Sequence, residues 1–448
     1  MSKCFKFGAS KDIITPCVET TMMGFGSVYG NRFQGIHDDL YVRVLQLQDD
    51  ANTIFLISLD LLFHDDTLAE KLRSYVWNKY KIPHDNLLVT YTHTHYGPAV
   101  KGYDFVFYNE EYEEFIFQRI TQCIDRTFLN LCEGTMEYSC VEGEWNISRR
   151  LIKDGVADPS IVPSPDGDVD KKMYILKLCD KQGHIRALVT NFACHPSNIN
   201  SYRVLSSEYP GRLCYLLEAQ NYGCTALFFQ GAGADAKLKM GAKTSKFKAI
   251  SYDECNEVAS SMALRVQNTL LNGTWTGIDV NLGSRMFQIK MPLEVYPKSV
   301  FEEELKGYNR NQNIRFDKSM VKSDEYSGSY LFWACAQYIV DHYDEMPDYI
   351  LLNCGVICLA ENFVIFTVGG EPSVDVKRVL EKLVTKGTML FFGYNDAIAY
   401  VPSDKMLKEG GYEAGDRSIT EYKMKGKFQS GMDERFLKGF QEALESLT

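Results

Sequence analysis

Five short runs of branched and aromatic residues constrain the fold of this chain more than any other feature. Each run is continuous and apolar, which is typical of a strand buried on both faces. The runs are 53–59, 86–90, 185–190, 224–229 and 363–368. Segments with apolar residues at helical spacing, such as Leu68, Leu72 and Val76, alternate with them. This alternation predicts an α/β fold.

A hairpin signal near the end of the chain adds an antiparallel element to this fold. Residues 356–360 and the run from Phe363 are separated only by Glu361 and Asn362. We therefore expect mixed β-sheets flanked by helices. Because no repeat, low-complexity tract or long linker divides the 448 residues, we expect one large catalytic domain, residues 1–448. Within it, the stretch from about 272 to 348 is a possible helical insertion.

Composition and charge exclude several classes of protein. The 48 Lys and Arg against 59 Asp and Glu give a net charge of -11, so no basic surface for nucleic acid is expected. No stretch approaches the ~20 apolar residues of a membrane-spanning helix, and the first residues lack a signal-peptide core. The 13 cysteines are odd in number and lack CxxC spacing, which favours a reducing compartment. We expect a cytoplasmic protein that acts on a small molecule, without membrane insertion, and leave its oligomeric state open.

Polar side chains follow each of the five apolar runs, at the point where the strand should end. They are Asp60, His93 with His95, His195, Asp235 and Glu371. The carboxyl ends of strands in an open α/β sheet are where loops build a site, so these side chains suggest one shared cleft.

His93 and His95 are separated by one residue, so on extended backbone both point to the same face. A bare His-x-His pair is more often structural, because short motifs match by chance. His195 and Glu371 reverse that preference here, since two histidines and one carboxylate with an open position form a common catalytic zinc set. Cys194 adjoins His195 but faces the other way on a strand, which favours a place in the core over a ligand role.

Two other segments carry weaker signals. Arg149 follows a polar segment and is a candidate to clamp a substrate carbonyl or carboxylate through its planar fork. The alternative is that it belongs to a solvated surface. The glycine-rich turn 230–235 lacks both the Lys-Ser/Thr of a P-loop and GxGxxG spacing, so nucleotide binding has little support.

The order of these residues resembles the neutral (non-lysosomal) ceramidase family. The resemblance runs from about residue 5 to about residue 420, and its most specific part is THTH at 92–95, followed by Gly97-Pro98. Further matching segments are 8–16, 58–60, 192–196, 230–235, 370–372 and 412–413. The resemblance implies a zinc amidohydrolase-like catalytic domain whose ligands fall on His93, His195, Glu371 and Tyr412. It also implies that His95 and Arg149 contact the substrate around the scissile amide.

Departures from the family pattern bear on the substrate. The serine of a Gly-Asp-Val-Ser-Pro-Asn element is absent, and Lys237 stands in its place. Tyr96 replaces a small serine after the THTH element, which predicts a narrower or differently polarised pocket. We expect no C-terminal immunoglobulin-like domain, because no room remains for it after about residue 430. The chain therefore looks like an intracellular bacterial-type branch of the family.

The function we predict is zinc-dependent hydrolysis, in which metal-activated water attacks an amide or ester bond of a small polar substrate. Tyr412 is expected to help stabilise the oxyanion, and His95 to exchange a proton with water or the leaving group. Lys237 either binds a carboxylate of the substrate or is an exposed surface lysine. Two alternatives stay open: a metal-dependent lactonase or phosphoesterase, and a non-catalytic metal- or ligand-binding homologue.

Overall fold

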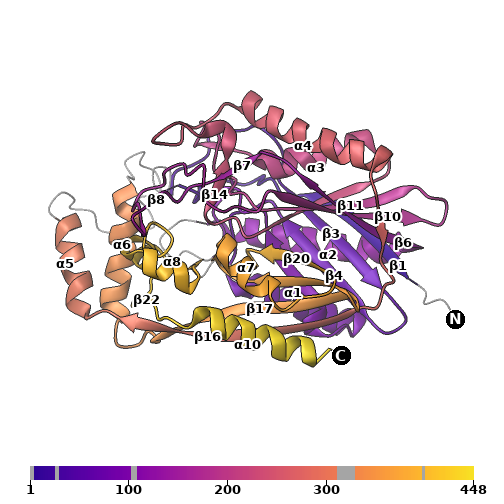
Figure 1. Ribbon diagram of the computed structural model, residues 1–448. Coiled ribbons are helices and arrows are strands. Elements are labelled where there is room, and N and C mark those ends of the chain that lie inside the picture. The colour runs from indigo at the N-terminus through magenta and orange to yellow at the C-terminus, as the bar shows by residue number, and fades with distance from the viewer. Residues whose placement is uncertain (1–4, 26–29, 102–107, 310–327, 396–398, 448) are drawn as a thin grey trace.

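Two β-sheets lie face to face in this protein, and helices cover the outer side of each sheet (Figure 1). The computed structural model describes residues 5–25, 30–101, 108–309, 328–395 and 399–447. The arrangement confirms the expected α/β class of mixed sheets flanked by helices.

The larger sheet has nine strands in the order β13-β11-β10-β6-β1-β3-β4-β5, with β15 paired to β6. Neighbours pair in parallel for β4 with β5 and for β11 with β13, and antiparallel elsewhere. Four of the five predicted runs are strands of this sheet. The nine strands are β1 (Lys6–Ile13), β3 (Tyr41–Gln48), β4 (Thr53–Leu59), β5 (Leu87–Tyr91), β6 (Cys132–Glu142), β10 (Lys172–Asp180), β11 (Ile185–Phe192), β13 (Thr225–Gln230) and β15 (Thr276–Gly277).

The smaller sheet has the order β20-β18-β17-β16-β22. Its strands are β16 (Gly283–Val295), β17 (Tyr349–Ala360), β18 (Phe363–Val368), β20 (Thr388–Gly393) and β22 (Gly426–Phe428). Strands β17 and β18 form the predicted hairpin. The β18 run is the fifth predicted strand, and it pairs in parallel with β20.

The stretch 272–348 is only partly helical. It contains helices α5 (Lys298–Asn309) and α6 (Gly328–His342), while residues 310–327 lie outside the described part. It also supplies β16, which pairs with β17 along ten residues of the smaller sheet. A helical reading of 283–295 is therefore wrong. This strand was not recognised because it is half-exposed, with charged side chains between its apolar ones and Pro292 inside it.

The remaining helices pack on the outer faces of the sheets. Helices α1 to α4 cover the larger sheet, and α7 and α10 cover the smaller one. Their bounds are α1 (Asp66–Tyr80), α2 (Glu110–Leu129), α3 (Glu208–Gln220), α4 (Tyr252–Asn272), α7 (Val374–Glu381), α8 (Asp404–Glu409), α9 (Asp416–Glu421) and α10 (Met432–Glu445). Side-chain caps start several of them: Asp65 accepts from the Thr67 amide before α1, and Ser251 with Glu254 forms a capping box at α4.

Short elements connect the sheets and helices. They are β2 (Gly35–Ile36), β7 (Asn146–Ser148), β8 (Ile152–Lys153), β9 (Val156–Ala157), β12 (Val204–Leu205), β14 (Ala236–Leu238), β19 (Glu371–Pro372), β21 (Tyr400–Val401) and the 3-10 turns η1 (His84–Asn86) and η2 (Lys239–Gly241). Three of these, β7, β14 and β19, lie next to the candidate site described below.

Burial on both faces explains why the strand runs are continuously apolar. On β4, Phe55 and Ile57 pack under the outer helices, while Ile54 and Leu56 face the second sheet. The larger sheet also curls until its two ends approach each other, and the Ser58 hydroxyl of β4 donates to the Phe228 carbonyl of β13 at 2.6 Å. The curl places the end of β5 beside the ends of β11 and β13, where the candidate site lies.

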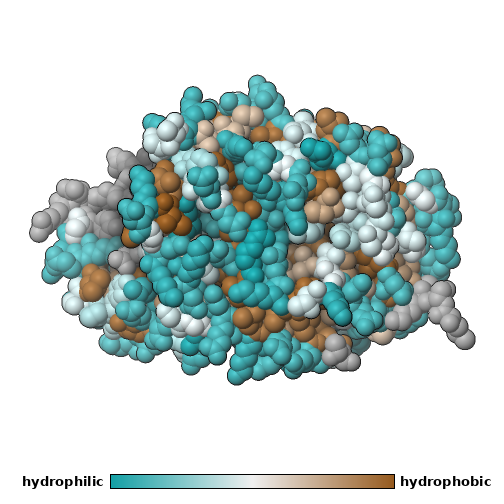
Figure 2. All heavy atoms as spheres, in the orientation of Figure 1, coloured by the Kyte–Doolittle hydropathy of each residue, from teal (hydrophilic) through white to brown (hydrophobic). Residues whose placement is uncertain are grey.

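Figure 2 shows hydrophilic residues over most of one face, with hydrophobic side chains scattered between them. Among the residues that the structure describes, no helix has both the length and the apolar character that crossing a membrane requires.

Candidate functional site

Four predicted site residues meet at the strand ends: His93, His95, His195 and Glu371. Ligand-type nitrogens of the three histidines lie within 4.8 Å of one another. Oε2 of Glu371 lies 3.2 Å from Nε2 of His93 and 3.6 Å from Nε2 of His195. They follow β5, β11 and β18, so the structure brings together the side chains that the strand ends predicted.

His93 owes its orientation to a turn and not to an extended strand. Its φ of +64° lies in the left-handed region, which non-glycine residues seldom adopt. The prediction that extended backbone aligns His93 and His95 is therefore wrong. Their rings still converge, with centroids 5.0 Å apart.

Backbone carbonyls fix which nitrogen carries the proton in two of the neutral imidazoles. Because a carbonyl only accepts, Nδ1 of His93 donates to the Leu62 oxygen at 2.9 Å, and Nδ1 of His95 donates to the Gly24 oxygen. Nε2 of each ring then keeps its lone pair. A Cβ at position 24 would lie 1.9 Å from the His95 carbonyl oxygen, so this approach requires glycine.

The unpartnered atoms at the centre of the site fit a metal ion. His93, His195 and Glu371 are each at most 2% exposed. Among the described residues, Nε2 of His93 and Oε2 of Glu371 have no hydrogen-bond partner, which is costly for buried acceptors. A cation between them would satisfy both, and two histidines with a carboxylate suit zinc.

His95 is the half-buried histidine of the group. Its Nε2 lies 2.8 Å from Nε2 of His195. Burial lowers the pKa of His95, and a proton on His93 would lower it further, while burial and then the Arg149 charge lower the pKa of His195. Both rings therefore favour the neutral form, which can bind a metal or accept a proton.

Gln230, at the end of β13, forms hydrogen bonds to the ends of two other strands next to these histidines. Its Oε1 accepts from the Cys194 amide at 3.1 Å, and its Nε2 donates to the carbonyls of Cys194 at 2.8 Å and Thr92 at 3.4 Å. The side chain is fully buried. The sequence singled out Asp235 and the glycine-rich turn in residues 230–235 but did not predict this role of Gln230.

Glu371 is held by the short parallel pair of β19 with β21. It lies opposite Tyr400 in this pair, and its amide donates to the Ala399 carbonyl at 2.8 Å. The preceding Gly370 has a φ of +74°, and a Cβ there would lie 2.4 Å from the Ala399 oxygen. The turn that delivers the carboxylate therefore requires glycine.

Two tyrosines next to Glu371 were missed from the sequence. The Tyr422 hydroxyl donates to Oε1 of Glu371. Burial and then the negative charge of Glu371 raise the pKa of Tyr400. Tyr412 is half-buried and contacts Tyr400 ring to ring, with centroids 5.7 Å apart. Tyr412 as a metal ligand stays a prediction, and no spacing rule would have selected Tyr400 or Tyr422.

Arg149 is buried and not part of a solvated surface, since it is 2% exposed. Its Nε donates to Oε1 of Glu413 at 2.8 Å, and its Nη2 donates to the Tyr400 hydroxyl at 3.2 Å. The guanidinium carbon lies 5.6 Å from the ring centroids of both Tyr400 and Tyr412. Arg150 shares Glu413, with Nη1 3.2 Å from Oε2.

The two aspartates at strand ends are engaged in internal contacts. Asp60 is fully buried and accepts from Nη1 of Arg43 at 2.6 Å. Asp235 accepts from the Val374 amide at 3.1 Å, and burial raises its pKa to about 7.

Tyr96 and Cys194 both belong to the core. The Tyr96 side chain is fully buried and its hydroxyl donates to the Ile199 carbonyl at 2.7 Å. The expectation that Tyr96 narrows the pocket is therefore wrong, because its hydroxyl is turned into the protein. Cys194 is also fully buried among apolar side chains, which confirms its predicted place in the core.

Lys237 is half-buried on β14, so the surface-lysine alternative is wrong. Its ammonium donates to the carbonyl and the hydroxyl of Ser197 at 2.8 and 2.9 Å. Burial and then the positive charge of Arg149 lower the pKa of Lys237 to about 8.

Comparison with known proteins adds the family. The model of the N-terminal part of neutral/alkaline non-lysosomal ceramidases matches residues 5–256, more than half of the chain. The chain belongs to this family. It is 25% identical over 241 residues to neutral ceramidase A of Dictyostelium discoideum, which covers 48% of this chain and 32% of that protein. The matched part thus spans about a third of that curated relative.

Two solved structures are similar in fold. The neutral ceramidase of Pseudomonas aeruginosa has a TM-score of 0.69 at 16% identity, over 100% of this chain and 75% of that one. A ceramidase complexed with C2 also gives 0.69 at 16% identity, over 99% and 76%. Within this fold, the three-histidine cluster of the chain is compatible with metal binding.

Proposed function

We propose that this chain is a zinc-dependent hydrolase that cleaves an amide or ester bond of a small polar substrate. The observation that carries the proposal is the pair of buried acceptors without partners, Nε2 of His93 and Oε2 of Glu371, which converge beside His195. His93, His195 and Glu371 would hold the ion. When bound, zinc supplies Lewis-acid polarisation of the scissile carbonyl and lowers the pKa of water.

His95 is the proposed proton carrier of the reaction. It is more exposed than His93 and His195, and its Nε2 lone pair points into the cluster. In hydrolysis of an amide, water oxygen bonds to the carbonyl carbon, the C–N bond breaks and the leaving nitrogen gains a proton. Nε2 of His95 would take that proton from water and give it to the nitrogen, leaving a carboxylic acid and an amine.

Arg149 and a tyrosine would orient the carbonyl and stabilise the developing oxyanion. Tyr412 is our candidate because it is half-buried and its ring lies against the Arg149 guanidinium. Tyr400 and Tyr422 are the matched alternatives, since both lie next to Glu371. Single Tyr→Phe changes at the three positions would show which phenol lowers kcat.

A substrate screen with and without a chelator tests the proposed function. We expect hydrolysis of small polar amides or esters that is lost with chelator and restored by zinc. Hydrolysis confined to lactones or phosphoesters would favour the alternative reactions, and no chelator-sensitive turnover would favour a binding protein. We expect long-chain ceramide to be a poor substrate, so ceramide turnover above ~1 s⁻¹ would contradict the substrate class.

A further inference from the structure

Lys237 stands beside the backbone that holds the proposed metal ligands. Strand β14 pairs antiparallel with β7, which sets Lys237 opposite Ile147 and Ala236 opposite Ser148. The Ala236 carbonyl accepts from the His195 amide at 3.0 Å. The residue after Ser148 is Arg149, so Arg149 and Lys237 lie on paired neighbouring segments.

The ammonium of Lys237 has neutral partners. Both of its hydrogen bonds within the described part of the chain go to Ser197, one to the carbonyl and one to the hydroxyl. Among the described residues, no carboxylate forms an ion pair with it. An ammonium carries three donors, so these bonds leave one N–H and the whole positive charge without a counterion.

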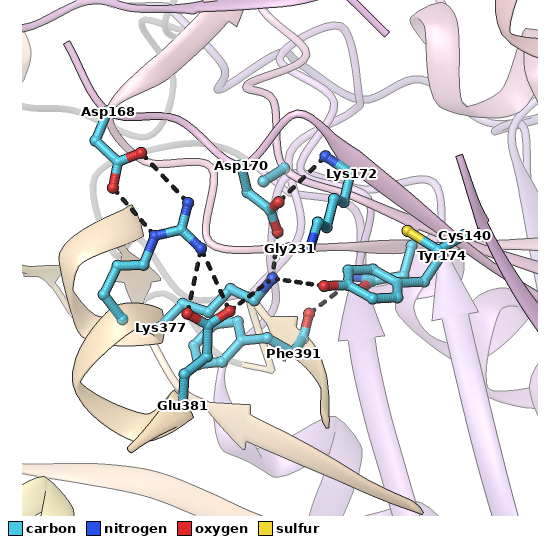
Figure 3. Close-up of polar contacts among 12 residues, drawn as sticks. Cys140, Asp168, Asp170, Lys172, Tyr174, Gly231, Lys377, Glu381 and Phe391 are labelled. Atoms are coloured by element: carbon cyan, nitrogen blue, oxygen red, sulfur yellow. Dashed lines mark hydrogen bonds and ion pairs between the residues drawn. The ribbon is translucent and has the colours of Figure 1, made fainter. Parts of the chain in front are cut away.

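The more deeply buried lysines of the protein have carboxylate partners. Lys377 is 2% exposed and its ammonium pairs with the Asp170 carboxylate, with the Tyr174 hydroxyl at 3.4 Å and Oε1 of Glu381 at 3.5 Å (Figure 3). Lys425 is 7% exposed and pairs with Asp348 at 2.7 Å. Where this protein buries a lysine for structural reasons alone, the chain thus provides a carboxylate partner for its charge.

The carboxylates around Lys237 serve other groups. Glu413 pairs with Arg149 and Arg150, and Arg150 also pairs with Glu409, so these two carboxylates match the two arginines. Glu208 is 2% exposed, and burial raises its pKa to about 8, so it is largely protonated at neutral pH.

We propose that Lys237 binds a carboxylate on the substrate, next to the scissile amide or ester bond. The inference rests on the proposed hydrolase function and narrows its substrate class to acylated amino acids and similar carboxylate-bearing amides. Lys237 is half-buried, and the Phe247 ring lies 5.8 Å from its ammonium. A charge-assisted hydrogen bond would supply the missing counterion.

Matched substrate pairs test this assignment. Zinc-loaded protein is given N-acetyl amino acids and the N-acetyl amines that lack only the carboxylate, and acetate release is followed. We expect kcat/KM to favour the carboxylate member by about tenfold or more, the scale of one charged contact. Lys237→Met should collapse this ratio toward one, mainly through a higher KM for the carboxylate member, whereas Lys237→Arg should keep a preference.

Lys239→Met is the matched control, because Lys239 lies two residues away, is exposed and pairs with Glu144. It should keep the wild-type ratio. A ratio that Lys237→Met leaves unchanged would overturn the inference, as would a loss confined to kcat, which would place Lys237 in the chemical step.

Equilibrium binding separates this inference from the proposed function. If no amide or ester is hydrolysed, the hydrolase proposal fails, and calorimetry with an N-acetyl amino acid still decides the role of Lys237. We expect binding about tenfold weaker in Lys237→Met than in wild type, with unchanged thermal unfolding. Equal affinities would overturn the inference, and so would tighter binding of inorganic phosphate than of the carboxylate.

Discussion

The side chains of Lys377 and Lys237 are buried and half-buried, respectively, and their surroundings differ. Under α7, the Lys377 charge is matched by Asp170, with Tyr174 and Glu381 close by. Among the described residues at the strand ends, the Lys237 ammonium has hydrogen bonds to the Ser197 oxygens alone, and Nε2 of His93 has no hydrogen-bond partner. The Lys377 charge is matched within the chain, whereas ligand-type atoms that stay unmatched and converge in one buried cluster indicate a site for a ligand.

The largest expected effect is the loss of the Lys377 ammonium. Lys377→Met leaves the Asp170 carboxylate, which is 5% exposed, without its counterion, so the free energy of unfolding should fall by about 3–5 kcal/mol. The double change with Asp170→Asn should recover much of the loss. Denaturant unfolding measures both. Lys237→Met should cost less than about 1 kcal/mol, and an equally large loss there would break the comparison.

A pH series on His64 extends the comparison to a third matched charge. The His64 ring lies between Asp65, at 3.0 Å, and Glu113, at 2.5 Å, and Lys101 pairs with Asp65 at 3.5 Å. Burial alone would lower the pKa of His64, but the hydrogen bonds to both carboxylates raise it to about 9. This folded-state value lies above the unfolded value of about 6.5.

The contribution of His64 to stability is therefore complete below about pH 6.5 and is lost as the pH rises through 9. The free energy of unfolding should fall by on the order of 3 kcal/mol between pH 6 and pH 10 because of this group. Chemical denaturation across this range would show a shallower fall in His64→Gln. Superimposable pH profiles for the two proteins would mean that the ring is not charged in the folded state.

His95→Ala sharpens the distinction between ligand and proton carrier within the site. Zinc content should stay near normal while turnover falls ~100-fold, the scale of a positioned acid-base group and about 2.7 kcal/mol of barrier. Elemental analysis and steady-state kinetics on the same preparation measure both. Zinc loss as large as in His93→Ala would show that His95 is itself a ligand.

The smallest effect is expected for the tyrosine that holds Glu371. Tyr422→Phe removes the donor to Oε1 of Glu371, so zinc should bind about tenfold more weakly, as for other partners of metal ligands. Competition with a chromophoric chelator measures the affinity. Tyr412→Phe is the matched variant. If Tyr412 is a ligand, Tyr412→Phe should weaken zinc binding more than Tyr422→Phe does. An unchanged zinc affinity in Tyr412→Phe would remove Tyr412 from the ligand set.

The strands that the sequence predicted best are the ones buried on both faces. The runs 53–59 and 363–368 became β4 and β18 with the same bounds, because both of their faces lie in apolar cores. Strand β16 was missed since one face of it reaches solvent and carries charged side chains. The apolar pattern of the sequence therefore identifies strands that are buried on both faces more readily than a half-exposed strand of a second sheet.

The site was predictable where side chains directly follow such strands. His93, His195 and Glu371 come at the ends of β5, β11 and β18, so a local rule found them. Tyr400 and Tyr422 reach Glu371 through the pairing of β19 with β21 and through the turn after α9. These are tertiary relations between distant segments, and nothing in the residues around Tyr422 marks it.

Elemental analysis of the purified protein tests the metal site most directly. We expect about one zinc per chain after mild purification, and much less in His93→Ala, His195→Ala and Glu371→Ala, because each removes one of three proposed ligands. Lys239→Met, outside the site, should keep the wild-type content. Metal-free wild-type protein that cannot be loaded with zinc, or zinc content that none of the three changes lowers, would contradict the site.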